Sequence, residues 1–542
     1  MLHGMITDRL ELATPKPQRW LLPLTDNLAL LAGLMMTTAL PPFRGTGWLA
    51  VLALAMLFRV LLTAPHPLRT AWLFGLAHQM SLLYWLFFLE PAASIPTQWL
   101  VPVQAILAIL YVSLFYLVFG LVMRLVRSRL GTAAALALAP AAWIGTEAWR
   151  GAGELGFPWC LVGAAWLNTP LKFMLASSGE LGLSAATALT AASLVALTTR
   201  NNDPDPVLPG GTWRYGLVIL TALVWIGLAV GAGWRQPLSR DPAGSNPRTA
   251  PLVVAAVQAD VSLDDKWRRA RLDSTIVPYT ELTAAAAAQG AELVVWAETA
   301  VPAYLILREP ELLRWVRSLA RDNQVHLYTG FPDAKLTSRG QLVKYNSSGL
   351  FGPQGDLIAQ YEKHHLLPVG ERMPFSDYLP FLADVDLGQA EWTPGTTPQP
   401  MVVPTAQGEL RFAGLICFES IFAGLARQAV QRGSQVLVNI TNDGWFGQTA
   451  GPRQHAALAR LRAVECGVPL VRCANNGISF VVDAAGNIQA WAGLGQRTVV
   501  SAEIVPGRGD TLFVRAGARP IAVILLAWSL LALLMTRREG AA

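Results

Sequence analysis

Apolar residues form long blocks in the first part of the chain, and one further block lies near its end. A helix that crosses a bilayer needs about 20 mostly apolar residues. Blocks that approach or exceed this length are found at 22–42, 46–64, 70–90, 98–123, 131–148, 172–198, 215–234 and 519–536. The pattern therefore predicts eight transmembrane helices, seven before a long polar stretch and one after it.

The polar stretch alternates short apolar runs with segments of helical period. Strands are expected at 252–258, 293–296, 326–330, 411–417, 436–441, 470–473 and 478–482, and helices at 267–289, 309–322, 422–431 and 453–466. Strands separated by helices indicate a layered α/β domain. We therefore expect a membrane domain at 1–235, an α/β domain at 236–518, and a last membrane helix with a short tail at 519–542.

Composition supports a membrane protein. The chain is 53% hydrophobic and 14% charged, whereas soluble domains carry about 25% charged residues. Its net charge is +6. We interpret this charge as a sign of membrane topology, because basic residues gather in alternate loops and no aromatic-basic interleaving suggests nucleic-acid binding.

The basic residues also predict orientation, because loops on the cytoplasmic side are enriched in Lys and Arg. With the N-terminus inside, the inner segments hold Arg9, Lys16, Arg19, Arg69, Arg124, Arg127, Arg129, Arg200, Arg214, Arg537 and Arg538. The short outer loops hold only Arg44, Arg150 and Lys172. Both termini are therefore expected inside and the α/β domain outside. No cleavable signal is evident in the polar N-terminal segment, so the first block is expected to remain as an anchor.

Three residues in the polar stretch can carry chemistry. Glu298 follows the apolar run Val-Val-Trp-Ala, Lys363 lies in Tyr-Glu-Lys-His-His, and Cys417 follows Gly-Leu-Ile. A cysteine at a strand-to-helix elbow is expected to have a lowered pKa and to lie near oxyanion donors. Taken singly, the three also fit a paired carboxylate, a surface lysine and a buried structural cysteine. Together they provide a base, a cation and a thiol nucleophile for acyl transfer.

The remaining cysteines are Cys160, Cys466 and Cys473. Four cysteines in a chain of this length do not form a disulfide framework. Cys466 and Cys473 could pair in an oxidising compartment, but two buried reduced thiols are the favoured interpretation.

The order Trp-Ala-Glu298, Tyr-Glu-Lys363-His-His-Leu-Leu-Pro-Val-Gly-Glu371 and Gly-Leu-Ile-Cys417-Phe-Glu419 resembles the nitrilase superfamily of carbon–nitrogen hydrolases. This resemblance covers nearly all of the polar stretch. With apolar blocks on both sides, the whole chain resembles the apolipoprotein N-acyltransferase family of the bacterial inner membrane. The resemblance implies an α-β-β-α sandwich domain in the periplasm, held on an eight-helix membrane body whose termini are cytoplasmic.

The resemblance also implies roles for individual residues. Glu298 would be the general base, Lys363 would stabilise the tetrahedral intermediate, and Cys417 would be the nucleophile. Glu371 and Glu419 would be supporting carboxylates. Residues implied to lie near the substrate are Trp267, Asn346 and Trp445, although Trp445 fits equally well as an aromatic packed beneath an Asn-Asp-Gly turn. One position departs from the family pattern, because Phe418 stands where many members have tyrosine.

The implied reaction has two steps. A phospholipid, with phosphatidylethanolamine as the expected donor, would acylate Cys417, and the α-amino group of a diacylglyceryl-modified apolipoprotein would then take the chain. No cofactor is expected, and His364 and His365 lack a third residue at metal-ligand spacing. Two other interpretations stay open: a membrane-tethered amidase that uses water, and a transporter or receptor with an inactive outer domain. The complete triad and the extensive membrane body disfavour them.

Overall fold

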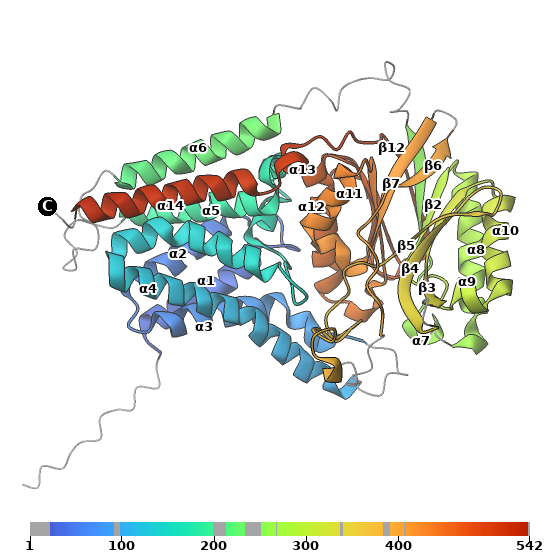
Figure 1. Ribbon diagram of the computed structural model, residues 1–542, viewed down its shortest axis with the longest axis horizontal. Coiled ribbons are helices and arrows are strands. Elements are labelled where there is room, and N and C mark those ends of the chain that lie inside the picture. The colour runs from blue at the N-terminus through green and yellow to red at the C-terminus, as the bar shows by residue number, and fades with distance from the viewer. Residues whose placement is uncertain are drawn as a thin grey trace, which may run out of the picture.

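The computed structural model describes residues 22–90, 98–198, 213–233, 251–266, 268–336, 340–382, 391–405 and 408–539. Figure 1 shows a lobe of helices beside a lobe that contains two sheets covered by helices. The last helix, α14 (Arg519–Glu539), returns from the α/β lobe to the helical lobe.

Every apolar block predicted from the sequence lies on a helix of the helical lobe. Besides α14, these helices are α1 (Leu24–Ala39), α2 (Leu49–Thr63), α3 (Pro67–Leu82), α4 (Val101–Arg150), α5 (Leu175–Thr198) and α6 (Trp213–Gly233). The expected blocks 98–123 and 131–148 both fall on α4, which is interrupted at Gly131 with φ of 84°. The prediction of a loop between these two blocks was wrong, because residues 124–130 continue the helix up to Gly131. The third block was placed too long, because α3 ends at Leu82 and the 3₁₀ turn Tyr84–Phe88 follows.

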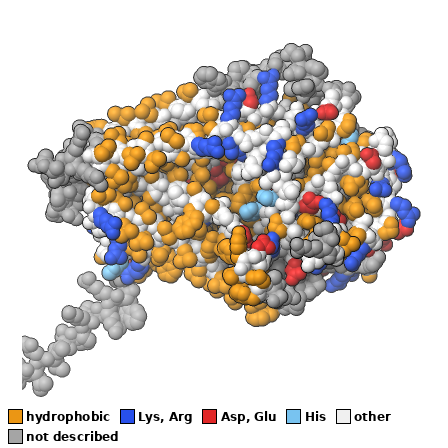
Figure 2. All heavy atoms as spheres, in the orientation of Figure 1, with side chains coloured by type: hydrophobic (Ala, Val, Ile, Leu, Met, Phe, Trp, Pro, Cys, Tyr) orange, Lys and Arg blue, Asp and Glu red, His pale blue; other side chains and the backbone are white. Residues whose placement is uncertain are grey.

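The face of the helical lobe seen in Figure 2 is largely apolar. On α14, for example, Val523 and Leu526 are 65% and 62% exposed. Among the described residues, three helical stretches are long and apolar enough to cross a membrane: Val101–Arg150, Pro170–Thr198 and Trp213–Gly233. The shorter apolar stretches Leu49–Thr63 and Arg519–Leu534 accompany them. A surface of this kind is suited to lipid, since apolar side chains in water are unfavourable in such numbers.

Two six-stranded sheets form the centre of the α/β lobe. The first has the order β12-β1-β2-β3-β4-β5 and the second the order β11-β10-β9-β8-β7-β6. The strands of the first sheet are β1 (Leu252–Gln258), β2 (Leu293–Trp296), β3 (His326–Leu336), β4 (Leu342–Phe351), β5 (Leu357–Glu362) and β12 (Thr498–Ile504). Those of the second are β6 (Met401–Thr405), β7 (Gly408–Ile416), β8 (Val436–Thr441), β9 (Leu470–Ala474), β10 (Ser479–Val482) and β11 (Ile488–Ala492).

Helices cover the outer face of each sheet, which confirms the expected layered α/β class. Helices α8 (Asp273–Ala288) and α10 (Pro310–Asp322) pack on the first sheet, and α11 (Ala423–Gln431) and α12 (Gly451–Cys466) on the second. A separate apolar core lies between the sheets. The sequence pattern located the parallel strands and the antiparallel strand β10, but it missed β4, β5, β6, β11 and β12. These antiparallel strands carry mixed polar and apolar residues and form the outer parts of the sheets.

The helical layer on the second sheet also packs against the helical lobe. Buried side chains of α11 and α12 belong to the same apolar cluster as those of the helical lobe. The guanidinium of Arg462 on α12 lies 3.1 Å from a carboxylate oxygen of Glu180 on α5 and 3.0 Å from one of Glu465. Glu465 also accepts a hydrogen bond from the Glu180 backbone N–H at 2.7 Å. Buried charges are tolerated only when paired in this way, so the contact fixes α12 on the body.

Candidate active site

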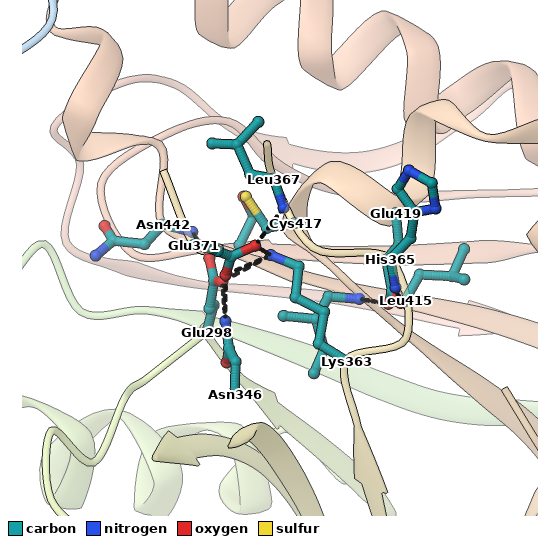
Figure 3. A network of polar contacts seen from close by, with 12 residues as sticks. Glu298, Asn346, Lys363, His365, Leu367, Glu371, Leu415, Cys417, Glu419 and Asn442 are labelled. Atoms are coloured by element: carbon teal, nitrogen blue, oxygen red, sulfur yellow. Dashed lines mark hydrogen bonds and ion pairs between the residues drawn. The ribbon is translucent and has the colours of Figure 1, made fainter. Parts of the chain in front are cut away.

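The three residues singled out in the sequence meet because each follows a strand of the sandwich. Glu298 comes just after β2 and Lys363 directly after β5, both in the first sheet, while Cys417 directly follows β7 in the second. Lys363 continues the β4–β5 ladder, since its N–H donates to the Asn346 carbonyl at 2.8 Å. Figure 3 shows the Cys417 side chain beside those of Lys363, Glu298 and Glu371.

Lys363 lies between two carboxylates. Its Nζ is 2.8 Å from Glu371 Oε2 and 3.5 Å from Glu298 Oε1. The side-chain amide of Asn346 donates to both acids, at 2.8 Å to Glu298 Oε1 and 3.0 Å to Glu371 Oε1. The structure therefore places Asn346 and Glu371 at the centre of the predicted site.

The Lys363 ammonium is held in its charged form. Its side chain is 1% exposed, and burial alone would lower its pKa. The Glu371 and Glu298 carboxylates overcome this and raise the pKa above the ordinary lysine value. A fixed positive charge is thus available beside the thiol.

Cys417 is different from the sequence expectation in one respect. Burial raises the pKa of its thiol, the Glu298 carboxylate raises it further, and Lys363 and a hydrogen bond with Thr441 offset only part of this. The pKa lowering expected for an elbow cysteine was therefore wrong, because desolvation and a neighbouring negative charge outweigh the local backbone effect. The sulfur rests as a neutral thiol, so it needs a base at the moment of attack.

The backbone at Cys417 is left-handed, with φ of 53°. A non-glycine residue held there costs about 1–3 kcal/mol and persists only where the surroundings enforce it. Strand β7 ends at Ile416 and the 3₁₀ turn Cys417–Ile421 begins at the thiol. The elbow expected from the sequence is therefore present.

Glu419 supports the site from behind. Its Oε1 accepts hydrogen bonds from the Tyr361 hydroxyl at 2.7 Å and from the N–H groups of His364 and His365 at 2.8 and 3.0 Å. Its Oε2 accepts from the Ile416 N–H at 2.7 Å. One carboxylate thus joins the segment after β5 to the end of β7, which keeps the lysine and the cysteine in register.

Two backbone-linked contacts of Glu298 were not foreseen. Its Oε2 accepts from the Asn442 N–H at 3.0 Å, and the Lys266 ammonium donates to its backbone carbonyl at 3.0 Å. Burial lowers the pKa of Lys266 to about 7, although the Glu298 charge acts in the opposite direction. No role had been predicted for the N–H of Asn442 in the Asn-Asp-Gly turn, and Lys266 lies eight residues beyond the expected strand 252–258.

The remaining predicted residues are placed unequally. Trp267 lies outside the described residues. Trp445 is half-buried, and its carbonyl accepts a hydrogen bond from the Glu90 N–H at 2.8 Å, so its role toward a substrate stays a prediction. Phe418, at the position where tyrosine was expected, packs against Phe157 and Phe422 at ring-centroid distances of 6.0 and 5.2 Å. An apolar ring suits these surroundings.

All four cysteines are free, as the favoured interpretation held. Cys160, Cys466 and Cys473 are buried, whereas Cys417 is partly exposed. Burial raises the pKa of the Cys466 and Cys473 thiols. Cys417 is therefore the thiol that a substrate can reach, and it has a carboxylate and an ammonium beside it.

Comparisons with known proteins agree with this arrangement. A family model described as carbon-nitrogen hydrolase matches residues 253–511, and one described as apolipoprotein N-acyltransferase N-terminal domain matches residues 32–193. An apolipoprotein N-acyltransferase of Azotobacter vinelandii is 36% identical over 95% of this chain and 96% of its own. One from Geobacter metallireducens is 33% identical over 83% of each chain. The solved structure of Saccharomyces cerevisiae Nit3 is 24% identical over 52% of this chain and 98% of its own, with a TM-score of 0.37, too distant to add to the assignment. The chain belongs to the apolipoprotein N-acyltransferase family.

Proposed function

We propose that this protein transfers a fatty acyl chain from a membrane phospholipid, through a thioester on Cys417, to the α-amino group of the N-terminal diacylglyceryl-cysteine of apolipoproteins. The observation that carries the proposal is the meeting of a partly exposed thiol with Glu298 and Lys363, in a lobe packed on an apolar helical body. Family membership supports the same reaction.

In the first step, Glu298 takes the thiol proton as the Cys417 sulfur attacks an ester carbonyl of the phospholipid. The sulfur–carbon bond forms, and the carbonyl oxygen becomes an oxyanion beside the Lys363 ammonium. Protonation removes the charge of Glu298, so Lys363 then has one carboxylate partner fewer and is freer to stabilise the oxyanion. The ester carbon–oxygen bond breaks, Glu298 returns its proton to the departing oxygen, and lysophospholipid leaves.

In the second step, the neutral α-amine of the acceptor attacks the thioester. The nitrogen–carbon bond forms, Glu298 accepts a proton from the amine, and the carbon–sulfur bond breaks. The proton returns to the sulfur, which restores the starting thiol. A thioester divides one difficult transfer into two easier ones and keeps the acyl group activated for an amine.

The finer assignments belong to the same proposal. Phosphatidylethanolamine is the expected donor. All eight apolar blocks cross the bacterial inner membrane, and α4 makes one crossing before Gly131 and one after it. Both termini are cytoplasmic, and the catalytic domain at 236–518 is periplasmic. The distribution of Arg and Lys between alternate loops supports this orientation.

The test uses the purified full chain in detergent–phospholipid micelles. Intact-mass analysis after incubation with phosphatidylethanolamine should show one acyl adduct, which peptide mapping should place on Cys417. Adding a diacylglyceryl lipopeptide should remove the adduct and give the N-acylated peptide. Release of free fatty acid instead would identify a hydrolase, and an adduct on Cys417→Ala would refute the nucleophile assignment.

A further inference from the structure

His455, in the first turns of α12, contacts the backbone carbonyl of the nucleophile Cys417. The residue is 1% exposed. Its Nε2 lies 3.1 Å from the Cys417 carbonyl oxygen and 3.2 Å from Ser420 Oγ. Its Nδ1 lies 3.1 Å from both Asp443 Oδ1 and a guanidinium nitrogen of Arg472. Neither the sequence motifs nor the proposed mechanism gives this histidine a role.

The partners of His455 fix its protonation state. Burial and the Arg472 guanidinium lower its pKa, against the opposing effect of Asp443, so the ring is neutral near pH 7. A proton on Nε2 can be donated to the Cys417 carbonyl, while Nδ1 accepts from Arg472. A proton on Nδ1 would instead be donated to Asp443 Oδ1, and the Nε2 lone pair would then face the Cys417 carbonyl oxygen at 3.1 Å, with Ser420 Oγ 3.2 Å away. We take the tautomer that donates to the Cys417 carbonyl as part of the inference, and the His455 variants described below test it directly.

Arg472 and Asp443 hold the imidazole in place. Arg472 pairs with Asp443 Oδ2 at 2.8 Å, and Thr441 donates to Asp443 Oδ1 at 3.0 Å. Arg472 also contacts Asn439, whose amide donates to the Leu415 carbonyl at 3.0 Å. Arg472 and Asp443 are buried, and the guanidinium keeps the pKa of Asp443 low despite burial. A charged pair buried this deeply is rigid only when fully hydrogen-bonded, as it is here.

The carbonyl that His455 contacts belongs to the strained residue itself. Cys417 has a left-handed backbone, and Ser420 Oγ donates to the same carbonyl at 3.0 Å. Rotation of this peptide would move the thiol relative to Glu298 and Lys363. Fixing the carbonyl therefore fixes the direction of the thiol.

The residue before His455 reaches the membrane body. Gln454 Oε1 accepts from the indole N–H of Trp85 at 2.9 Å and from that of Trp159 at 2.8 Å. Its amide donates to the Leu82 carbonyl, the last residue of α3, at 3.1 Å. Trp159 also lies against His455, at a ring-centroid distance of 5.7 Å. Both tryptophans are 3% exposed, so they act through packing within the protein and not on bulk lipid.

We propose that Gln454 and His455 form a positioning pair that makes the geometry of the nucleophile depend on the membrane body. Gln454 fixes the start of α12 on Trp85 and Trp159, and His455 transmits that position to the Cys417 carbonyl. The inference rests on the proposed function. It adds a reason why the activity of the catalytic lobe should depend on the helical lobe against which it packs.

The first experiment compares His455→Asn with His455→Gln. A glutamine amide can place a donor where Nε2 lies, whereas an asparagine amide reaches only the Nδ1 position. We expect His455→Asn to slow thioester formation on Cys417 about 10- to 100-fold at saturating phospholipid, with KM within about twofold, because one buried donor is lost. His455→Gln should stay within about threefold of the wild type. Equal losses in both variants, or no loss in either, would overturn the role of His455.

The second experiment removes the indole donors. The double variant Trp85→Phe, Trp159→Phe should slow thioester formation about 5- to 50-fold, again with little change in KM. Trp166→Phe is the matched control, because it removes an equally buried indole bond, 2.8 Å to Thr187 Oγ1, that stays inside the body. A double variant as fast as the wild type, or a control that is equally slow, would overturn the coupling.

A third measurement separates this inference from the proposed function. Alkylation of Cys417 by iodoacetamide needs no lipid, so its rate reports the direction of the thiol in any case. If the wild type forms no thioester, the proposed function fails, while slower alkylation of His455→Asn than of His455→Gln would still support the positioning pair. Equal alkylation rates would contradict it.

Discussion

Replacing Glu298 with glutamine should change two properties of Cys417 in opposite directions. The Glu298 carboxylate raises the pKa of the thiol, so it lowers the resting amount of thiolate. In the proposed mechanism the same carboxylate also accepts the thiol proton during attack. Glutamine removes the negative charge and the basicity while keeping the shape of the side chain.

The size of each effect follows from the contacts. Glu298 Oε1 is 3.5 Å from Lys363 Nζ, a separation worth about 5 kcal/mol at an effective dielectric constant near 20. Without Glu298, the Lys363 ammonium acts more strongly on the Cys417 thiol. A fall of one unit in the pKa of the thiol needs only about 1.4 kcal/mol, which is a small part of that interaction. We therefore expect about tenfold more thiolate below the thiol pKa. Loss of a general base should slow acylation by phospholipid about 10²- to 10⁴-fold.

Stability should fall only modestly. Glu298 accepts from Asn346 at one oxygen and from the Asn442 N–H at the other, and a glutamine can keep one of these two bonds as an acceptor. The loss of one such bond costs about 1–3 kcal/mol. A thermal midpoint measurement on the Glu298→Gln variant would establish that the protein is folded before any rate is interpreted.

The assay follows both reactions on the same preparation. Intact mass gives the rate of acyl-thioester formation with phospholipid, and iodoacetamide alkylation between pH 6 and pH 9 gives the reactivity of the thiol. We expect acylation to collapse and alkylation to rise in Glu298→Gln. If both rates fall together, the electrostatic reasoning is wrong, and if acylation continues at the wild-type rate, Glu298 is not the base.

Three further predictions concern the fold and its surroundings. Arg462→Met leaves the carboxylates of Glu180 and Glu465 buried without their partner, so denaturant titration should show a loss of about 3–5 kcal/mol in the free energy of unfolding. The control Arg453→Met, at an exposed position of α12, should change this free energy little. Leu530→Arg, on the exposed apolar face of α14, should reduce membrane insertion at a cost of about 2.5–3.5 kcal/mol. The control Leu336→Arg, at an exposed position of the α/β lobe, should not reduce it. Equal yields of the two variants in the membrane fraction would argue against a lipid-facing α14. Thiol labelling of the native protein should modify Cys417 alone, and labelling in denaturant without reductant should modify all four cysteines; fewer labels would reveal a disulfide.

The positions of Glu298 and Cys417 could be predicted because β2, and β7 toward its end, are buried on both faces. Such strands have continuous apolar sequences, so the ionisable residue Glu298 and the thiol of Cys417 are conspicuous where β2 and β7 end. The antiparallel strand β5, which carries Lys363 at its end, has mixed burial and gave no such signal. Lys363 was found through its motif alone.

The electrostatics could not be predicted from local sequence. The elbow at Cys417 suggested a lowered pKa, but burial of the thiol raises it, and so does the charge of Glu298, which comes from the other sheet. The network around His455 was missed for the same reason, because Asp443, His455 and Arg472 lie on three separate elements. One signal was present in the sequence: Arg472 interrupts the apolar strand Leu-Val-Arg-Cys-Ala, and an arginine there requires a buried acid.

The charges of the site suggest why the proposed reaction can proceed away from bulk water. Glu298, Glu371 and Lys363 give one net negative charge beside a neutral thiol. Transfer of the thiol proton to Glu298 moves this charge to the sulfur without changing the total, so no ion has to be exchanged with solvent. When the sulfur attacks, the charge moves on to the substrate oxyanion, while Glu371 keeps Lys363 charged and in place at 2.8 Å. A low-dielectric site tolerates the movement of an existing charge far better than the creation of a new one. Because the reaction creates no new charge, water can be excluded from the site, and this protects the thioester from hydrolysis until the amine arrives.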